Sequence, residues 1–384
     1  MAITYSSLPK LKYFFSIFDT IKENKEIIKP WLKNQYDFEL FSCSAISLYF
    51  IIKKISNTTE EENISIWIPD FFCNSSLEAI RDLNIEIIFY PINNNLTPNL
   101  EWCEINLKPE KTNIFLFVHY FGYIFNLQSV SEFCSKYKIW LIEDAAHVLL
   151  PTPEIGVYGD FIMYSPHKHL PIYDGAILIV TNRGNDKFKK SSALTITNKR
   201  IQLKSKYSEK VSKFLVFNWI IKRVIQLLGF RIYFPNYEFW PDHKKYNISF
   251  NHIRMSKISK LFLHRIAPEL TNISKTRIKN CISWSEHLIK NKTEIKNVML
   301  VDSFRVPYLA FFEISNIELM NKVFYKLKKM NFPITSWPDL PPELMKDENL
   351  HSVAIGLRKT RLYFHVHHSI SGKDISKITS KINL

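Results

Sequence analysis

Short apolar runs alternate with longer amphipathic segments along residues 44–180. The runs predict strands and the amphipathic segments predict helices, because the two structures bury side chains with different periods. The predicted strands are almost wholly apolar, as parallel strands are when helices cover both faces of a sheet. The pattern predicts a large α/β/α domain with a mainly parallel sheet. Its strands would cover 64–68, 85–90, 114–119, 139–142, 161–164 and 176–180, and its helices 44–55, 75–83 and 127–137.

A second series of elements follows an interruption at 183–250. Helical periodicity predicts helices, and short apolar runs predict strands. This alternation predicts a smaller C-terminal α/β lobe. We therefore divide the chain into a large domain of residues 1–250, with a basic and aromatic insertion at 183–245, and a small domain of residues 251–384. The elements of the small domain would be helices over 251–266, 317–330 and 374–382 and strands over 307–314 and 362–366.

Polar residues follow several predicted strands at the point where each strand ends. Asp144 ends one apolar strand, and Lys168 comes shortly after the next. In open sheets of this kind, ligands bind outside the carboxyl ends of the strands. An acid and an amine at neighbouring strand ends are the pair that pyridoxal phosphate requires, for its ring nitrogen and for a Schiff base. A solvated lysine and a helix-capping aspartate are the alternative interpretation.

Composition narrows the class of protein. The chain has 384 residues, enough for two domains. Its five cysteines are widely spaced without a CxxC pair, which argues against a disulfide framework and a structural zinc site. We expect no metal. The first residues lack the pattern of a signal peptide, so we expect a cytoplasmic protein.

Several motifs occur in the order found in a known family. They are Ser42-Cys43-Ser44-Ala45, Trp67 to Phe72, Val118 to Gly122, Leu141 to His147, Gly156 to Phe161, Ser165 with Lys168, Asp174-Gly175, Asn251 to Ser256 and Val366 to Ile370. In this order they resemble the DegT/DnrJ/StrS group of sugar aminotransferases. The resemblance implies a pyridoxal-phosphate enzyme of fold type I, and it covers roughly residues 40–180 and 250–375.

The resemblance also implies roles for individual residues. Lys168 would carry the cofactor and move a proton, Asp144 would face the ring nitrogen, and His147 would lie against the ring or its hydroxyl. His167 and His169, if protonated, would help to lower the pKa of the Lys168 amine. The remaining cofactor-binding residues would be Phe71 or Phe72 against the ring, and Cys43, Ser44 and Ser165 around the phosphate at a helix N-terminus.

The implied reaction moves an amino group from glutamate to a nucleotide-linked keto-sugar for surface polysaccharide, in a homodimer. The family's Arg-x-His-Gly segment is absent: residues 195–204 offer only Asn198, Lys199 and Arg200. Related enzymes with histidine at the lysine position dehydrate their sugar instead. A sugar dehydratase and a non-catalytic protein that binds a membrane or polyanion are therefore the alternatives.

The insertion carries most of the net charge. Residues 183–231 hold thirteen Lys and Arg against two acidic residues, in a chain of net charge +15. Apolar residues from Phe214 to Leu228 recur with helical spacing. This helix would pack on its own domain or on a dimer partner, or it would lie on anionic lipid through residues 210–240, peripherally at the inner membrane. No motif indicates specific nucleic-acid binding.

Overall fold

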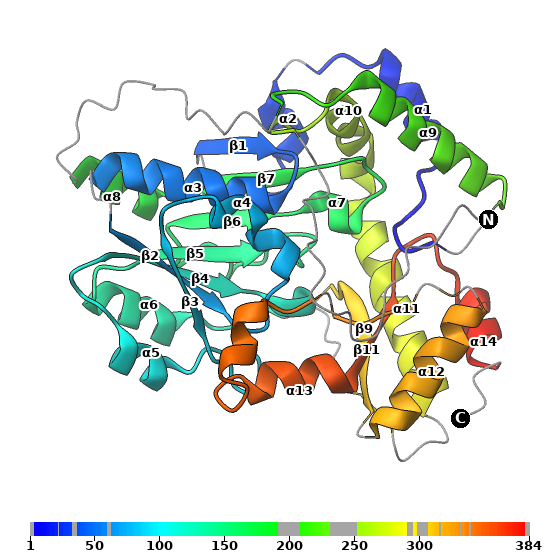
Figure 1. Cartoon of the computed structure of the whole chain (residues 1–384). Helices are drawn as coiled ribbons and strands as arrows, with labels where there is room; N and C mark the ends of the chain where they lie inside the picture. The colour runs from blue at the N-terminus through cyan, green and yellow to red at the C-terminus, as the bar shows by residue number, and fades with distance from the viewer. Residues whose placement is uncertain are drawn as a thin grey trace.

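A computed structural model gives the fold of the chain (Figure 1). It describes residues 4–21, 23–32, 37–59, 63–190, 208–230, 252–289, 295–297, 306–314, 316–330, 332, 334–337 and 339–380. A seven-stranded sheet forms the centre of the large domain, and a four-stranded sheet forms the centre of a smaller lobe. The two-lobed α/β architecture predicted from the chain is present.

The large sheet has the strand order β1-β7-β6-β5-β4-β2-β3. Strands β3, β2, β4, β5 and β6 are parallel, and β7 runs antiparallel to both of its neighbours. All six strands predicted from apolar runs are present, with ends that differ by up to three residues, and β1 is an addition. The bounds are β1 Asp37–Phe41, β2 Ile64–Pro69, β3 Glu86–Tyr90, β4 Thr112–Val118, β5 Trp140–Ala145, β6 Phe161–Tyr164 and β7 Ala176–Val180.

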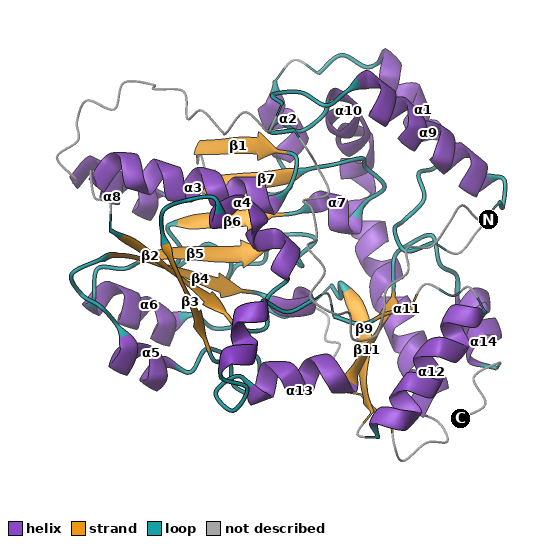
Figure 2. Ribbon diagram, viewed as in Figure 1, coloured by secondary structure: helices purple, strands orange, loops and turns teal. Residues whose placement is uncertain are grey.

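Helices cover both faces of this sheet (Figure 2). Alternate residues of β6 belong to different cores: Phe161 and Met163 to one, Ile162 and Tyr164 to the other. Side chains on a strand alternate between faces, so each face has its own apolar partner layer. Helix α3 packs on β1, β6 and β7. The helical elements of this part are α3 Ser44–Thr59, η2 Asn74–Leu77, α4 Glu78–Arg81, α5 Leu100–Asn106, η3 Tyr120–Gly122, α6 Gln128–Lys136, α7 Pro166–His169 and α8 Asn182–Lys190.

A group of helices at one corner covers the other face near β1 and β7. A helix was predicted over 251–266, but α10 begins only at Lys257. The preceding segment is extended because Arg254 forms a β-bridge with Phe41 at the end of β1. Asn251 lies outside the described residues. The helical elements here are α1 Leu11–Phe14, η1 Phe15–Phe18, α2 Asn24–Ile28, α9 Lys213–Leu227, α10 Lys257–Ile266 and η4 Ala267–Glu269.

The small lobe is an antiparallel sheet of order β10-β11-β9-β8 with helices beside it (Figure 2). The strands predicted over 307–314 and 362–366 and the helices predicted over 317–330 and 374–382 are present in this lobe, whereas the helix predicted over 251–266 packs with the large domain as α10. Helices α11 and α13 and strands β8 and β10 are additions. The bounds are α11 Leu270–Ile289, β8 Ile295–Asn297, β9 Leu309–Ile314, α12 Ile317–Lys329, β10 Ile334–Thr335, η5 Pro342–Lys346, α13 Ser352–Thr360, β11 Arg361–His365 and α14 Gly372–Thr379. Among the described residues, no helix combines the length and apolar character needed to cross a bilayer.

Candidate active site

A cavity of about 420 Å³ lies at the carboxyl ends of the central strands. This volume suits a small-molecule ligand. The large domain and the small lobe both contribute to its walls, so the cavity depends on how the two pack together. Its lining includes Tyr5, Ser6, Cys43, Ser44, Phe72, Ser75, Ser76, Asp144, His147, Met163, His167, Lys168, Tyr308, Thr335, Ser336, Trp337, Tyr363 and His365.

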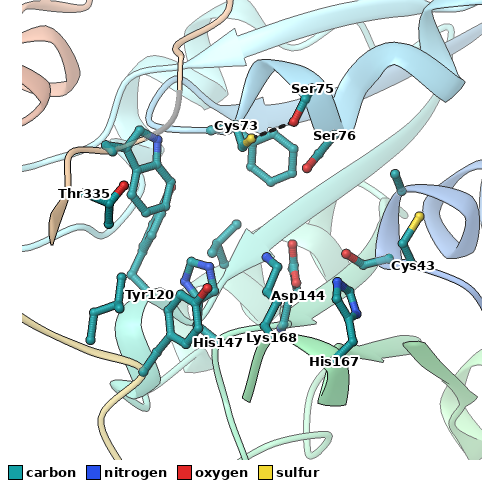
Figure 3. A pocket seen from close by; sticks show the side chains of 18 of the residues that line it. Cys43, Cys73, Ser75, Ser76, Tyr120, Asp144, His147, His167, Lys168 and Thr335 are labelled. Carbon is teal, nitrogen blue, oxygen red and sulfur yellow. Dashed lines mark hydrogen bonds between the residues drawn. The ribbon is translucent and has the colours of Figure 1, made fainter. Parts of the chain in front are cut away.

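Asp144 and Lys168 lie next to each other in this cavity (Figure 3). Asp144 is near the end of β5, and its neighbour on β6 is Met163, which is followed by the turn that carries Lys168. The parallel pairing therefore brings the two predicted residues to one edge of the sheet. Burial raises the pKa of the Asp144 carboxyl, and the charge of Lys168 opposes that shift. The Asp144 carboxylate also accepts a hydrogen bond from the Ala146 amide at 2.9 Å.

His147 has a defined orientation in the cavity wall. The amide of Phe121 donates to its Nδ1 at 3.3 Å, so the neutral ring carries its proton on Nε2. The ring stacks on Tyr308 with centroids 4.5 Å apart. Burial lowers the pKa of His147 well below its usual value, with a further contribution from Lys168. His147 is therefore a neutral N–H donor near pH 7.

The turn after β4 holds the Phe121 amide in place. Phe121 has a backbone φ of 57°, a left-handed conformation that residues other than glycine rarely adopt. Gly122 follows with a φ of 90°, and a Cβ there would lie 2.3 Å from the carbonyl oxygen of Val306. Glycine is therefore required where the two parts of the chain approach each other beside the cavity.

His167 and His169 do not act as the protonated neighbours that the sequence led us to expect. Burial lowers the pKa of His167 to about 4 and that of His169 well below its usual value. His167 Nδ1 donates to the Gly175 carbonyl at 2.7 Å, and His169 Nε2 lies 3.2 Å from the Ala146 carbonyl. Both rings are neutral near pH 7, so the expectation that they act as cations beside Lys168 is wrong.

The two phenylalanines that follow β2 point in different directions. Phe72 lines the cavity. Phe71 is not among the lining residues; it is fully buried and stacks on Trp337 with centroids 4.4 Å apart. Of the two candidates for contact with a cofactor ring, only Phe72 lines the cavity. Phe71 instead supports Trp337, which lines the cavity itself.

Hydroxyl groups gather at the end of the cavity near α3. Cys43 and Ser44 line it where α3 begins. Ser75 and Ser76 from η2 lie across from Lys168 (Figure 3), and the sequence interpretation missed them. Two adjacent serines at the start of a predicted helix were a signal that could have found them. Ser165 is outside the lining, and its buried hydroxyl has no hydrogen-bond partner among the described residues.

Glu143 stabilises the loop that follows Asp144. Its carboxylate accepts hydrogen bonds from the amides of Gly156, at 2.9 Å, and Gly159, at 2.6 Å. His119 Nε2 lies 3.3 Å from the same carboxylate. Since side chains alternate along a strand, Glu143 and Asp144 point to opposite faces of β5. The acidic pair thus combines a structural residue with one that lines the cavity.

Other parts of the motif series lie away from the cavity. Arg254 pairs with Glu39 at 2.6 Å and is not a lining residue. His367 donates to the carbonyl of Thr4 at 2.8 Å and so holds the N-terminal segment, from which Tyr5 and Ser6 line the cavity. The residues Asn198, Lys199 and Arg200, offered in place of the absent Arg-x-His-Gly segment, lie outside the described residues.

Comparison with known proteins gives matches of three kinds. A model of the DegT/DnrJ/EryC1/StrS aminotransferase family matches residues 44–217. The lipopolysaccharide biosynthesis protein RfbH of Salmonella typhimurium is 34% identical over 71 residues, a match that covers 17% of this chain and 16% of RfbH. The chain therefore matches a small part of the length of that relative.

Solved structures match over nearly the whole chain. The putative sugar aminotransferase Spr1654 from Streptococcus pneumoniae, in its PLP-form, has a TM-score of 0.68 at 12% identity and full coverage of both chains. Helicobacter pylori PseC, an aminotransferase involved in the biosynthesis of pseudoaminic acid, has a TM-score of 0.67 at 12% identity and covers 99% of this chain and 98% of its own. At these identities the likeness shows the fold, and the predicted fold class is confirmed.

Proposed function

We propose that this chain, a member of the DegT/DnrJ/EryC1/StrS aminotransferase family through residues 44–217, is a pyridoxal-phosphate enzyme that aminates a nucleotide-linked keto-sugar for surface polysaccharide. Glutamate would supply the amino group. The observation that carries the proposal is the meeting of Asp144 and Lys168 in one cavity at the carboxyl edge of the sheet. RfbH is named for lipopolysaccharide biosynthesis, which supports the same pathway class.

The residues of the cavity fit pyridoxal phosphate. Asp144 is 6% exposed, and burial raises its pKa, so its carboxyl needs a cation such as a protonated ring nitrogen. Ser44, Ser75 and Ser76 line the end of the cavity near α3, and their hydroxyls can donate to phosphate oxygens. The first turn of α3, which begins at Ser44, offers amide donors to the same anion. These groups match the two ends of the cofactor.

Each lining residue then has a role that its position supports. When bound, pyridoxal phosphate would supply an electron sink for removal of a proton from the amino donor. Lys168 would hold the cofactor through Nζ, and the same amine would take up and return that proton. Asp144 would face the ring nitrogen as a carboxylate. His147 would donate its Nε2–H toward the ring hydroxyl, in the tautomer set by the Phe121 amide.

The far wall of the cavity suits a sugar. Tyr308 and Trp337 present aromatic surface, and Thr335 and Ser336 present hydroxyl groups. Apolar rings pack against the C–H faces of a sugar, and hydroxyls pair with its oxygens. These residues come from the small lobe, so the packing of the lobe on the large domain would determine which sugar fits.

We propose a homodimer because the cavity is short of positive charge. Among the described lining residues, Lys168 is the only Lys or Arg. The cofactor phosphate, the donor carboxylate and a nucleotide diphosphate together carry several negative charges. Further cations must come from a partner subunit or from residues 191–207, which include Lys199, Arg200, Lys204 and Lys206.

The geometry favours amine transfer over dehydration. Lys168 is beside Asp144, whereas His167 is tied to the Gly175 carbonyl and His169 is not among the lining residues. The reactive position of this chain is thus a lysine. A non-catalytic protein that retained the fold has no need for a buried carboxylate beside an amine.

The absorption spectrum of the purified protein tests the proposal. We expect a yellow protein with a visible band, and borohydride reduction should leave the cofactor attached to the peptide that contains Lys168. Lys168→Ala should lose the band and all covalent attachment, whereas Lys279→Ala, on the exposed side of α11, should keep both. A wild-type protein that stays colourless after incubation with pyridoxal phosphate would refute the assignment. A screen of keto-sugar nucleotides with glutamate would then identify the substrate.

A further inference from the structure

We infer that the outer face of α9, formed by Phe214, Phe217, Ile221, Val224 and Leu228, binds the surface of an anionic phospholipid bilayer. These side chains are 68%, 58%, 41%, 38% and 71% exposed. Their spacing of three and four residues places them on one side of the helix. Apolar residues in this arrangement normally face a core, and here they face solvent.

The inner face of α9 is held by specific contacts, so the helix cannot turn to bury its outer face. Arg223 donates to the hydroxyl of Ser6 at 2.6 Å and to the side chain of Gln226 at 3.0 Å. Trp219 packs edge-on against Phe262 of α10 with centroids 5.8 Å apart. Rotation of the helix would break these contacts and expose the buried Gln226.

The neighbouring N-terminal helices add to the same apolar surface. Phe14 of α1 packs on Phe262, the same side chain that supports α9. On their solvent side, α1 and η1 expose Leu11 and Phe15, which are 70% and 64% accessible. Of the fourteen large hydrophobic residues exposed in the described part of the chain, nine lie in α1, η1 and residues 208–230. The exposure is concentrated at one corner, seen at the upper right of Figure 1.

The charges around the outer face indicate what covers it. On a helical projection, the exposed Lys213 and Lys222 lie on opposite sides of the apolar stripe, and Lys210 precedes it. Residues 208–230 contain one acid, Glu209, which lies 3.7 Å from Arg254 in an ion pair. An apolar stripe between lysines suits an interface where rings enter the acyl boundary and ammonium groups stay among lipid phosphates.

The same charges argue against a second copy of the chain as the occupant. A two-fold contact through this face would bring the lysines of one copy toward those of the other. An anionic lipid surface offers the opposite charge, and each basic residue near it strengthens partitioning about fivefold. The helix has 15 residues, fewer than the roughly 20 that span a bilayer.

This surface binding is separate from the proposed reaction, because no residue of the outer face lines the cavity. It would hold the enzyme at a membrane surface. Failure of lipid binding would leave the aminotransferase assignment intact, and a colourless protein could still bind lipid.

Flotation of the full-length protein with phosphatidylcholine vesicles, with and without phosphatidylglycerol, tests the inference. We expect binding only to the anionic vesicles, with loss at high salt. Phe214→Glu with Phe217→Glu should lower partitioning at least about tenfold. Lys213→Ala with Lys222→Ala should lower it about 25-fold. Two matched controls should bind like the wild type: Ile105→Glu, at a side chain 77% exposed on α5, and Lys275→Ala with Lys279→Ala on α11.

Sedimentation velocity on the same variants separates lipid from protein partners. Absence of the wild type from anionic vesicles at low salt would overturn the inference. So would unchanged flotation of the Phe214→Glu, Phe217→Glu protein. If the phenylalanine variant instead dissociates a wild-type oligomer, the outer face is a subunit interface and the lipid assignment fails. Circular dichroism should show native helix content in every variant, since each substitution is at an exposed position.

Discussion

The cavity and the outer face of α9 depart in opposite directions from the usual distribution of side chains. In the cavity a carboxyl that is 6% exposed lies beside an amine, whereas on α9 a phenylalanine is 58% exposed. Charged groups are rarely buried without partners, and clustered apolar groups are rarely left in water. Both departures cost stability, so each indicates a function. The cavity is suited to a small polar ligand, and the helix is suited to an apolar surface.

Replacement of the buried carboxyl should have the largest effect. Asp144→Asn keeps the shape of the side chain but removes the charge that we propose faces the ring nitrogen of the cofactor. We expect the transamination rate to fall by about 10²- to 10³-fold, because the electron sink weakens when that nitrogen loses its proton. Stopped-flow measurement of the half-reaction with glutamate would show it. Asp144→Glu should retain more activity, and equal loss in both variants would favour a purely structural role.

Asp144→Asn should also remove a pH dependence of the stability of the cofactor-free protein. Burial raises the folded-state pKa of Asp144, so the folded protein binds its proton more tightly than the unfolded chain does. Its contribution to stability is therefore complete below the ordinary aspartate pKa and is lost as pH rises through the folded-state value. Asp144→Asn should remove that loss, as a comparison of denaturant unfolding at several pH values would reveal.

Paired substitutions on α9 sharpen the contrast between its two faces. Trp219→Ala removes a ring that packs on Phe262 and should cost about 2–3 kcal/mol of the free energy of unfolding. Phe217→Ala removes a ring that is 58% exposed and should change this free energy by less than about 0.5 kcal/mol. Denaturant melts of the two proteins would compare them. Similar losses would mean that the outer face is covered in solution.

Protonation of His167 should have a smaller effect, on the stability of the protein at acid pH. The folded-state pKa of His167 is lowered to about 4, below the ordinary value of 6.5. The unfolded chain therefore binds the proton first, and stability declines as pH falls below about 6.5. Between pH 6.5 and 5 we expect His167 to account for between about 1 and 2 kcal/mol of that decline. His167→Asn should flatten the dependence of melting temperature on pH. An unchanged slope would show that His167 titrates normally.

Much of the fold could be predicted because it depends on local patterns. The strands of the central sheet are continuous apolar runs, and their positions agree with the structure. Strand β1 was missed because Asp37–Phe41 mixes charged and apolar residues and pairs with β7, far along the chain. The start of α10 was placed too early because the bridge between Arg254 and Phe41 keeps that segment extended. Long-range pairing leaves no periodic signal in the sequence.

Some residues of the candidate site could likewise be predicted from local patterns, and others could not. Asp144 and Lys168 could be located because each follows a recognisable strand, and parallel strands end at a common edge. Trp337 and Tyr308 could not, since they belong to a lobe whose packing on the large domain is a matter of tertiary structure. The sequence also could not show which of Phe71 and Phe72 lines the cavity, because both are phenylalanines. In the structure, Phe71 stacks on Trp337 and Phe72 faces the cavity.

By itself, the sequence determined the alternation of strands and helices in the large domain, the pair of residues at the centre of the cavity and the amphipathic character of α9. These follow from side-chain periodicity and from residue type, which are local properties. Tertiary structure decided which side chains share a cavity, that His167 and His169 are neutral, and that the apolar stripe of α9 faces outward. Desolvation and exposure depend on what the rest of the chain places around a residue, and no local pattern records that.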